Sequence, residues 1–301
     1  MTFSSFSRAW NQWWFRTGPP HLLALYRIIF GGFLLIYFGI QLPYVAMLYS
    51  REGILLPLFE PSTTLTLIFT PPSAAIAYFL FLTFLTFLLF FTLGFLTRVS
   101  AAVAMILYIY YWCISLFQFG TSFDRLFMFV LLVLVPSGCG KTFSMDMFFK
   151  RGSFAAWEPI SVLPQRLIAV QITATYLGVG WQKLMLPAWQ SGKVLVYGFM
   201  GRWATAPAWA IARWNLPLWF YDANVWLIKV FELTIPFGLW FRRTRWWYFL
   251  AGTLFHVGIA ILLDIWWFVA LIPSYIVFFE PEEILGFLTK TAQGRRKRRR
   301  E

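Results

Sequence analysis

Charged side chains are scarce in this chain of 301 residues: 12% of the residues are charged, 60% are hydrophobic and 22% are aromatic. Soluble domains carry about 25% charged residues, and a chain this short of polar groups cannot cover a core with a wettable surface. The composition therefore excludes an ordinary water-soluble globule and indicates a protein solvated by lipid. The few charges are unbalanced, with a formal net charge of +13.

Cysteine and histidine are also scarce. The chain has two cysteines, Cys113 and Cys139, and two histidines, His21 and His256. Two cysteines cannot build a disulfide framework, and no CxxC redox or zinc pattern is present. A metal site made of several histidines is excluded by the histidine count. We therefore expect no metal and interpret both cysteines as small apolar residues.

Long apolar runs are the main feature of the sequence. About twenty apolar residues cross the hydrocarbon core of a bilayer as a helix. The runs predict an all-α fold, a polytopic transmembrane bundle of about eight spans. The fourth run is short and needs its flanks, or a half-buried entry at Asp124 and Arg125, to reach across. The predicted spans are 22–40, 74–93, 99–117, 123–136, 165–186, 225–241, 246–263 and 266–280.

The distribution of lysine and arginine predicts the orientation, because positively charged loops stay in the cytoplasm. Eight spans with both termini inside place most of the basic residues of the short connections on the cytoplasmic side. We therefore expect an integral protein of the cytoplasmic (inner) membrane of a bacterium. The inside connections hold Arg98, Lys141, Lys150, Arg151, Arg242, Arg243 and Arg245, and the outside ones hold Arg51, Lys193, Arg202 and Arg213.

The flanks of the membrane domain 21–285 are amphipathic or basic. Residues 1–20 mix aromatic and polar side chains, which is typical of an interfacial helix rather than a cleavable signal peptide. The outside connections 41–73 and 187–224 are rich in Trp, Pro and Leu, so we expect interfacial helices there, on the outer side, that roof a cavity. The tail 286–301 ends in a basic run that would bind anionic headgroups. Aromatic side chains that would favour nucleic acid are missing from it.

One sequence resembles a nucleotide-binding loop. Residues 136–142 read Pro-Ser-Gly-Cys-Gly-Lys-Thr, but Val135 stands where the full pattern needs glycine. A phosphate cradle also needs a strand before it and a helix behind it. We interpret Gly138 and Gly140 as the turn that ends the fourth span.

Ionisable residues inside apolar runs are the candidate functional groups, since a charge at mid-bilayer costs about 2.5–3.5 kcal/mol on insertion scales. Lys229 and Glu232 stand three apart on one helix face, which favours an ion pair, although Glu232 could also orient a group on a neighbouring span. Arg27 and Asp124 could form a second pair. His256 is either a hydrogen-bonded core histidine or a cavity group. The full set is Arg27, Asp124, Arg125, Lys183, Lys229, Glu232, His256 and Asp264.

Lys183 differs from the others because no acid lies within seven residues of it. A face formed by Thr173, Tyr176 and Gly180 leads up to it at helical spacing. A desolvated lysine without a counter-charge is biased toward the neutral amine, which is a usable general base. The alternative is that Lys183 extends to the outer interface and anchors the helix.

Around these residues the chain resembles the HTTM family, the membrane domain shared with vitamin K-dependent gamma-glutamyl carboxylase. The resemblance begins at Arg27 in the first span and ends near Phe279. Its best pieces are Ser144 to Asp146, the Gly-x-x-Lys-Leu segment at 180–184, Glu232 before Pro236, and Phe255-His256. Trp189 and Gly192 follow the Lys-Leu segment at family-like positions.

The resemblance implies a reduced quinone, similar to vitamin K, as cofactor. In the carboxylase, the corresponding lysine deprotonates the reduced vitamin, and oxygen then gives an epoxide and a strong base. Lys183 and His256 are thus the expected catalytic residues. The residues expected around the cofactor are Tyr176, Trp189, Glu232, Asp124 and Arg125.

Two departures from the carboxylase limit this expectation. Asp124 and Arg125 stand where the carboxylase has a histidine, and a basic tail stands where it has a large luminal region. Glutamate carboxylation is therefore not supported, and a soluble or secreted partner on the outer side is a possible substitute. Two functions stay open: a membrane enzyme acting on a quinol, and a non-enzymatic maturation, immunity, scaffold or permeation protein. Transport would normally show inverted repeats with broken helices, and the sequence shows no convincing internal repeat.

Overall fold

The computed structural model describes residues 3–55, 69–115 and 121–298. The chain divides into two compact units: a first unit made of 1–167 and 279–301, and a second unit made of 168–278. Both units are helical. In the described part of the chain, strand structure is limited to the two-residue strands β1 (Thr17–Gly18) and β2 (Ile160–Ser161), which pair antiparallel within the first unit.

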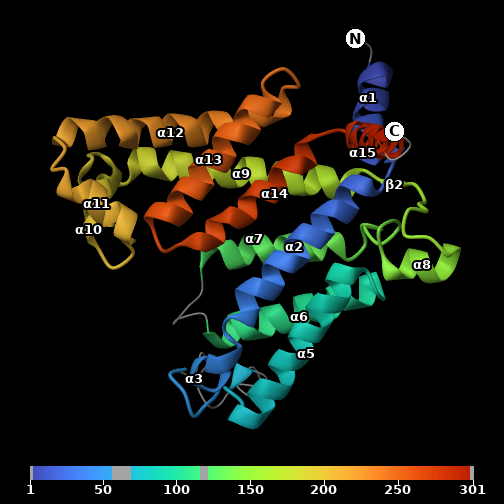
Figure 1. Ribbon diagram of the computed structural model, residues 1–301, viewed down its shortest axis with the longest axis horizontal. Helices are drawn as coiled ribbons and strands as arrows, with labels where there is room; N and C mark the ends of the chain where they lie inside the picture. The colour runs from blue at the N-terminus through green and yellow to red at the C-terminus, as the bar shows by residue number, and fades with distance from the viewer. Residues whose placement is uncertain (1–2, 56–68, 116–120, 299–301) are drawn as a thin grey trace. The chain divides into compact units, whose positions relative to one another are not determined.

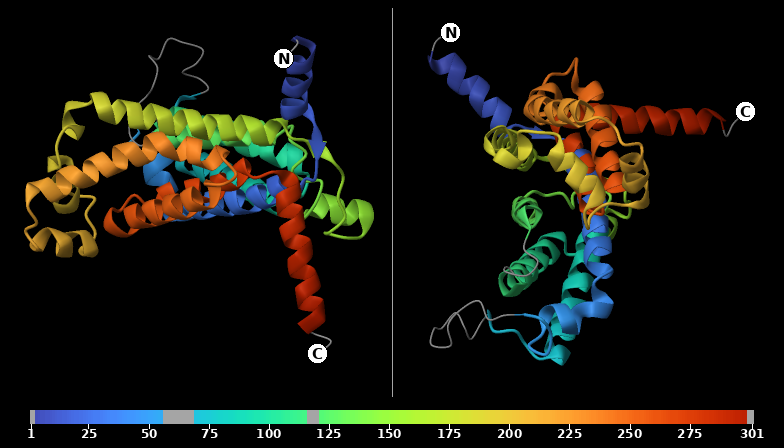
Figure 2. Two further views of the ribbon diagram at one scale, coloured as in Figure 1. Left: turned by 90° about the horizontal axis from the view of Figure 1, so that it is seen from above. Right: turned by 90° about the vertical axis from the view of Figure 1, so that its left-hand side faces the viewer.

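The first unit is built on a row of apolar helices. Helix α2 (His21–Gly39) packs on α5 (Ala74–Leu93), α5 packs on α6 (Thr97–Ser115), and α6 packs on α7 (Ser122–Leu134), as Figure 1 shows. The short helices η1 (Leu42–Tyr44) and α3 (Val45–Tyr49) follow α2, and α8 (Met145–Arg151) follows α7. Helices α1 (Phe3–Phe15) and α15 (Pro281–Arg298) begin and end the unit, and Figure 2 shows α15 projecting away from the row.

Helix α5 shows why the row needs lipid. Its buried residues recur at helical spacing, with Phe81, Phe84 and Leu88 fully enclosed. The opposite face is just as apolar, because Phe79 and Leu82 are exposed. A helix that is apolar on all sides but buried on one is stable only where the other side meets hydrocarbon.

A buried arginine of α2 contacts the end of α5 and the loop before α8 in the first unit. Arg27 of α2 is fully buried, and its Nη2 donates to the carbonyl of Phe143 at 2.5 Å. Gly94, at the end of α5 with φ +71°, lies directly against this guanidinium and against Ser144. Asp146 accepts from the backbone nitrogens of residues 96 and 97 at 2.7 and 2.9 Å. The predicted Arg27–Asp124 pair is therefore wrong; the arginine holds the loop before α8 instead.

Gly94→Ala is expected to destabilise the protein by more than about 1 kcal/mol. A β-carbon at Gly94 would add left-handed backbone strain and would collide with Arg27. Gly152 is the matched control: it ends α8 with φ +68°, but a β-carbon added there would have no atom within 4 Å. Thermal unfolding in detergent should show a larger loss for Gly94→Ala than for Gly152→Ala. Equal losses would mean that the arginine contact contributes nothing.

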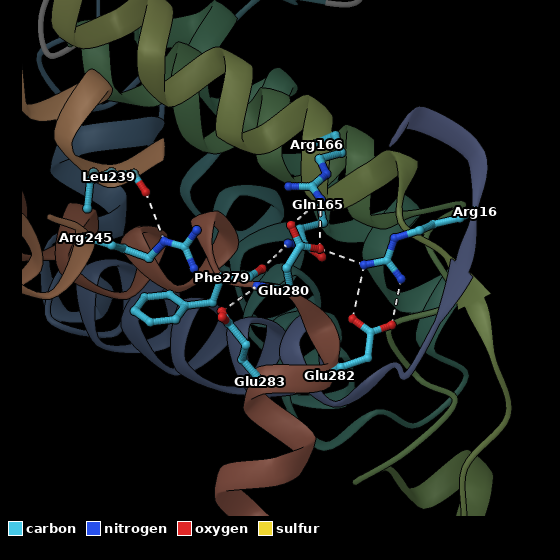
Figure 3. A network of polar contacts seen from close by, with 9 residues as sticks. All are labelled: Arg16, Gln165, Arg166, Leu239, Arg245, Phe279, Glu280, Glu282 and Glu283. Atoms are coloured by element: carbon cyan, nitrogen blue, oxygen red, sulfur yellow. Dashed lines mark hydrogen bonds and ion pairs between the residues drawn. The ribbon is translucent and has the colours of Figure 1, made fainter. Parts of the chain in front are cut away.

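Four charged residues connect the start of α15 with the segment after α1 and with the start of α9 (Figure 3). Arg16 donates to Glu280 and Glu282 at 2.6 Å each, and Arg166 donates to Glu280 at 2.7 Å. Gln165 adds a bond to the carbonyl of Phe279 at 2.6 Å. These contacts link segments more than 100 residues apart.

The Arg16–Glu282 contact predicts a dependence of stability on pH. The hydrogen bond from Arg16 holds the pKa of Glu282 below its usual value of 4.5. A carboxyl whose pKa is depressed by folding contributes stability above its unfolded pKa and loses it as pH falls through the folded pKa. The melting temperature should therefore fall between pH 5 and pH 3, less so in Arg16→Gln. The half-exposed pair contributes at most about 1 kcal/mol to the free energy of unfolding. Identical pH profiles of the melting temperature in the wild type and in Arg16→Gln would exclude this contribution.

The second unit contains the rest of α9 (Leu163–Met185), which begins in the first unit. Short helices η2 (Pro187–Trp189), α10 (Lys193–Met200) and α11 (Ala206–Arg213) connect it to α12 (Leu218–Trp240). Helix α13 (Arg245–Leu262) packs on α12, and the stretch η3 (Trp266–Ala270), α14 (Leu271–Ser274) and η4 (Tyr275–Phe278) packs on α13. Asp264, in the turn after α13, is exposed.

The described parts of all eight predicted segments are helical, and most boundaries agree within two residues. Residues 116 and 117 of the third predicted segment lie outside the described residues. The largest error is the sixth segment: α12 begins at Leu218, seven residues before the predicted 225. Three described segments are long and apolar enough to cross a membrane, namely His21–Tyr49, Ala74–Leu93 and Thr97–Ser115. The number of eight spans and the interfacial placement of α1, α10 and α11 stay predictions. Residues 56–68 of the predicted 41–73 connection lie outside the described residues.

Candidate functional site

An ion pair joins α9 and α12 in the second unit, near the C-terminal end of α9. Lys183 Nζ donates to Glu232 Oε1 at 2.5 Å, and the two side chains are 14% and 7% exposed. Trp189 of η2 covers the amine, with its ring centroid 4.4 Å from Nζ. Two opposite charges this close and this dry neutralise each other, and the indole face adds a cation–π contact.

Glycines allow α12 to approach closely enough for this pair. A β-carbon at Gly180 would lie 2.9 Å from the side chain of Leu233, so the absence of a side chain lets the two helices touch one turn before Lys183. Gly192 lies against the backbone of α12, and its nitrogen donates to Asp222 Oδ1 at 2.5 Å. The Gly-x-x-Lys segment is therefore a docking surface that positions the lysine.

A chain of three hydrogen-bonding side chains lies in the same unit. The hydroxyl of Tyr176 is 2.6 Å from His256 Nε2 and 2.6 Å from the hydroxyl of Tyr275. All three residues are buried. Gly252 makes room for this arrangement, because a β-carbon there would lie 2.7 Å from the Tyr275 ring.

Three buried polar atoms of this region have no hydrogen-bond partner among the described residues: Lys229 Nζ, Glu232 Oε2 and His256 Nδ1. Lys229 is 1% exposed, and its ammonium lies 4.4 Å from the Trp226 ring centroid. Buried polar atoms are nearly always satisfied in native proteins. These three atoms are therefore the groups of the second unit that are able to form a further hydrogen bond.

Two predictions about this region are wrong. Lys183 was expected to have no negative neighbour, yet Glu232 is bound to it. Lys229 and Glu232 were expected to pair, but Glu232 turns to Lys183 and Lys229 turns to Trp226. The reason is that spacing along one helix shows which groups could meet and says nothing of a better partner on another helix.

The predicted polar face of α9 does turn toward its neighbours. Thr173 accepts from Trp240 Nε1 at 2.9 Å, Tyr176 meets His256, and Lys183 meets Glu232. Five of the seven predicted site residues thus belong to the second unit: Tyr176, Lys183, Trp189, Glu232 and His256. Sequence reasoning missed Tyr275, whose only signal was a polar atom in the last apolar run.

Asp124 and Arg125 belong to the first unit. Asp124 is buried and caps α7: its Oδ2 accepts from the nitrogen of Thr121 at 2.6 Å, and its Oδ1 accepts from Tyr108 at 2.8 Å. It lines a cavity of about 220 Å³ with Tyr37, Tyr49 and other aromatic residues. Arg125 is exposed, 6.0 Å from the Trp112 ring centroid. Asp124 therefore has a structural role as a cap and a place at a cavity wall.

The chemistry that the second unit can perform follows from its groups. Lys183 supplies a fixed positive charge, Glu232 supplies a carboxylate oxygen with a free lone pair, and the Tyr176–His256 pair can pass a proton. In the described residues no cluster of three or more His, Cys, Asp or Glu side chains could hold a metal. The arrangement suits proton transfer from a weakly acidic hydroxyl.

Comparison with known proteins gives the family. The search of curated proteins and the search of solved structures each returned no match. The HTTM domain family matches residues 15–282, which span both units and every predicted site residue. This chain is therefore a member of the HTTM family, an α-helical membrane protein of the carboxylase-like group.

Proposed function

We propose that this protein is an integral membrane enzyme that binds a reduced quinone-like, lipid-soluble substrate and starts its oxidation by removing a hydroxyl proton at the Lys183–Glu232 pair. We place it in the inner membrane of a bacterium with both termini in the cytoplasm, where the basic tail meets anionic lipids. The single observation that carries the proposal is the buried ion pair in the same unit as the Tyr176–His256–Tyr275 chain.

Unpartnered polar atoms and aromatic rings of the second unit support a hydroquinone as the substrate. Glu232 Oε2 and His256 Nδ1 are buried without partners, so they can meet polar groups of a ring-shaped ligand. A bound reduced quinone would supply an acidic phenolic hydroxyl and the two electrons that dioxygen takes up. Trp189 and Tyr176 supply flat surfaces of the kind that pack against rings.

Because Lys183 is paired with Glu232, the proton acceptor differs from the one expected from the sequence, which was Lys183 itself. An ammonium cannot accept a proton, so Glu232, through its free oxygen, is the acceptor of the pair. Lys183 then keeps its positive charge where negative charge develops. At 4 Å and an effective dielectric constant of 20, such an attraction is worth about 4 kcal/mol. The Tyr176–His256 pair of the same unit supplies further groups that can exchange a proton.

One observation favours a second function. An ion pair that joins α9 to α12 can also select which faces of the two helices meet, without any catalytic role. A non-enzymatic maturation, immunity or scaffold protein with a soluble partner on its outer side would need no more than this.

The two functions predict different results for the purified protein. In reconstituted vesicles, an enzyme should consume oxygen with a quinol and should carry isoprenoid quinone in lipid extracts analysed by mass spectrometry. Oxygen uptake equal to that of protein-free vesicles, together with extracts free of quinone, would contradict the enzyme and favour the scaffold.

A further inference from the structure

A second polar site lies in the first unit, at residues that the proposed function does not use. A cavity of about 390 Å³ is lined by the start of α6, the end of α7 and the loop before α8. Its size is in the range of small-ligand pockets, and a water molecule occupies about 30 Å³ of liquid. Gly138, Gly140 and Lys141, from the sequence that resembled a nucleotide-binding loop, all line it.

The glycines of this loop allow Lys141 and Arg98 to line the same cavity. Gly138 has φ +71°, a conformation that L side chains rarely adopt, and so makes the turn after α7. Gly140 lies in close contact with Thr97, and a side chain at this position would collide with it. This approach brings Lys141 to the same wall as Arg98, the residue after Thr97.

Positive charge is in excess at this cavity. Arg98, Lys141 and Lys150 line it, and Arg151 is bound beside it to Glu158. Against these four cations stand two carboxylates, Glu158 and Asp146.

Asp146 is already fully used, because its oxygens accept from the backbone at 96 and 97 and from the hydroxyl of Thr97. Among the described residues, Arg98 takes part in no ion pair. The residues that line the cavity therefore carry one positive charge in excess, and Arg151 beside it adds a second.

Glu158 holds the lysines in place. It lies 2.6 Å from Lys150 Nζ, 3.2 Å from Arg151 Nη2 and 3.6 Å from Lys141 Nζ. The hydrogen bonds from Lys150 and Arg151 lower the pKa of Glu158 to about 2, so the carboxylate is charged at neutral pH. Its 3.6 Å contact with Lys141 is the loosest, which leaves Lys141 the most available of the three cations.

We propose that this cavity binds a phosphate ester, held by Arg98 and Lys141 with Lys150 at its edge. Arginine and lysine are the side chains that bind phosphate oxygens in proteins. Two sources share this chemistry: the headgroup of an anionic phospholipid and a soluble phosphate compound.

The surroundings favour a lipid headgroup as the source. Phe149, Phe154 and Trp157 are 66%, 46% and 44% exposed on α8 and the loop that follows it. Exposed aromatic side chains next to basic ones are typical of the membrane interface. Excess lysine and arginine also predict that this loop lies on the cytoplasmic side, where anionic lipids attract basic residues.

The test compares two double variants of the full chain with the same loss of charge. Arg98→Gln/Lys141→Gln removes the cavity cations, and Arg242→Gln/Arg243→Gln removes two exposed arginines outside the cavity that have the same predicted sidedness. Native mass spectrometry would count phosphatidylglycerol retained from mixed phosphatidylglycerol and phosphatidylcholine vesicles. Titration calorimetry with inorganic phosphate and with ATP would test the soluble source. Melting temperatures check that each variant is folded.

The cavity variant is expected to lose at least about tenfold of the phosphatidylglycerol retained, with less than about twofold loss in the control. Binding of phosphate or ATP that the cavity variant loses would support the site with a soluble source. Equal loss in both double variants, or no binding of any probe by the wild type, would overturn it.

Discussion

Replacing Lys183 with alanine is expected to lower quinol-dependent oxygen uptake by about 10²–10⁴-fold. The change removes the positive charge from the place where negative charge develops, and it removes the hydrogen-bond partner of Glu232. Losses of this size are typical when one group of an acid–base pair is deleted. The measurement is the initial rate of oxygen uptake in vesicles with a reduced isoprenoid quinone.

Lys193→Ala is the control for this result. Lys193 begins α10 in the same unit and is exposed, so its loss changes the net charge equally without touching the pair. Lys183→Arg tests geometry, since it keeps the charge but lengthens and flattens the group. Full activity in Lys183→Ala would remove Lys183 from the catalytic residues and leave the scaffold function.

Glu232→Leu is expected to destabilise the protein by about 3–5 kcal/mol. It leaves the Lys183 ammonium in a site from which water is largely excluded, and an unpaired buried charge carries a cost of this order. Unfolding in detergent, followed by denaturant or heat, would measure the loss.

The double variant Lys183→Met/Glu232→Leu separates this cost from the value of the pair. Replacing a buried pair with apolar groups of similar size is often neutral or stabilising. We therefore expect the double variant to unfold near the wild-type midpoint while lacking activity. A double variant as unstable as Glu232→Leu would show that packing, and not the stranded charge, causes the loss.

The sequence predicted the helices well, for a physical reason. Apolar runs such as 74–93 are bounded by a serine before them and a glycine after them, and these same residues end the helix. The start of α12 was missed because Leu218 to Asn224 carries the Trp and Asp of an interfacial segment, which hides helical continuity. Sidedness and the number of spans depend on the bilayer and stay predictions.

The candidate site was predicted as a set of residues but not as a set of contacts. Tyr176, Lys183 and Glu232 stood out because polar groups in apolar runs are rare. Their partners depend on which helices pack together, and that is decided by glycines such as Gly180 and Gly252, whose role emerges only in three dimensions. Tyr275 escaped notice because a tyrosine in an aromatic-rich chain carries no distinguishing pattern.

The lone Oε2 of Glu232 makes this carboxyl a built-in vibrational reporter. If a proton reaches it, the carbonyl stretch of an acid without a donor nearby would stand apart in frequency from the bands of hydrogen-bonded carboxyls. Difference infrared spectra recorded with and without a quinol could therefore follow the proton directly in the unaltered protein.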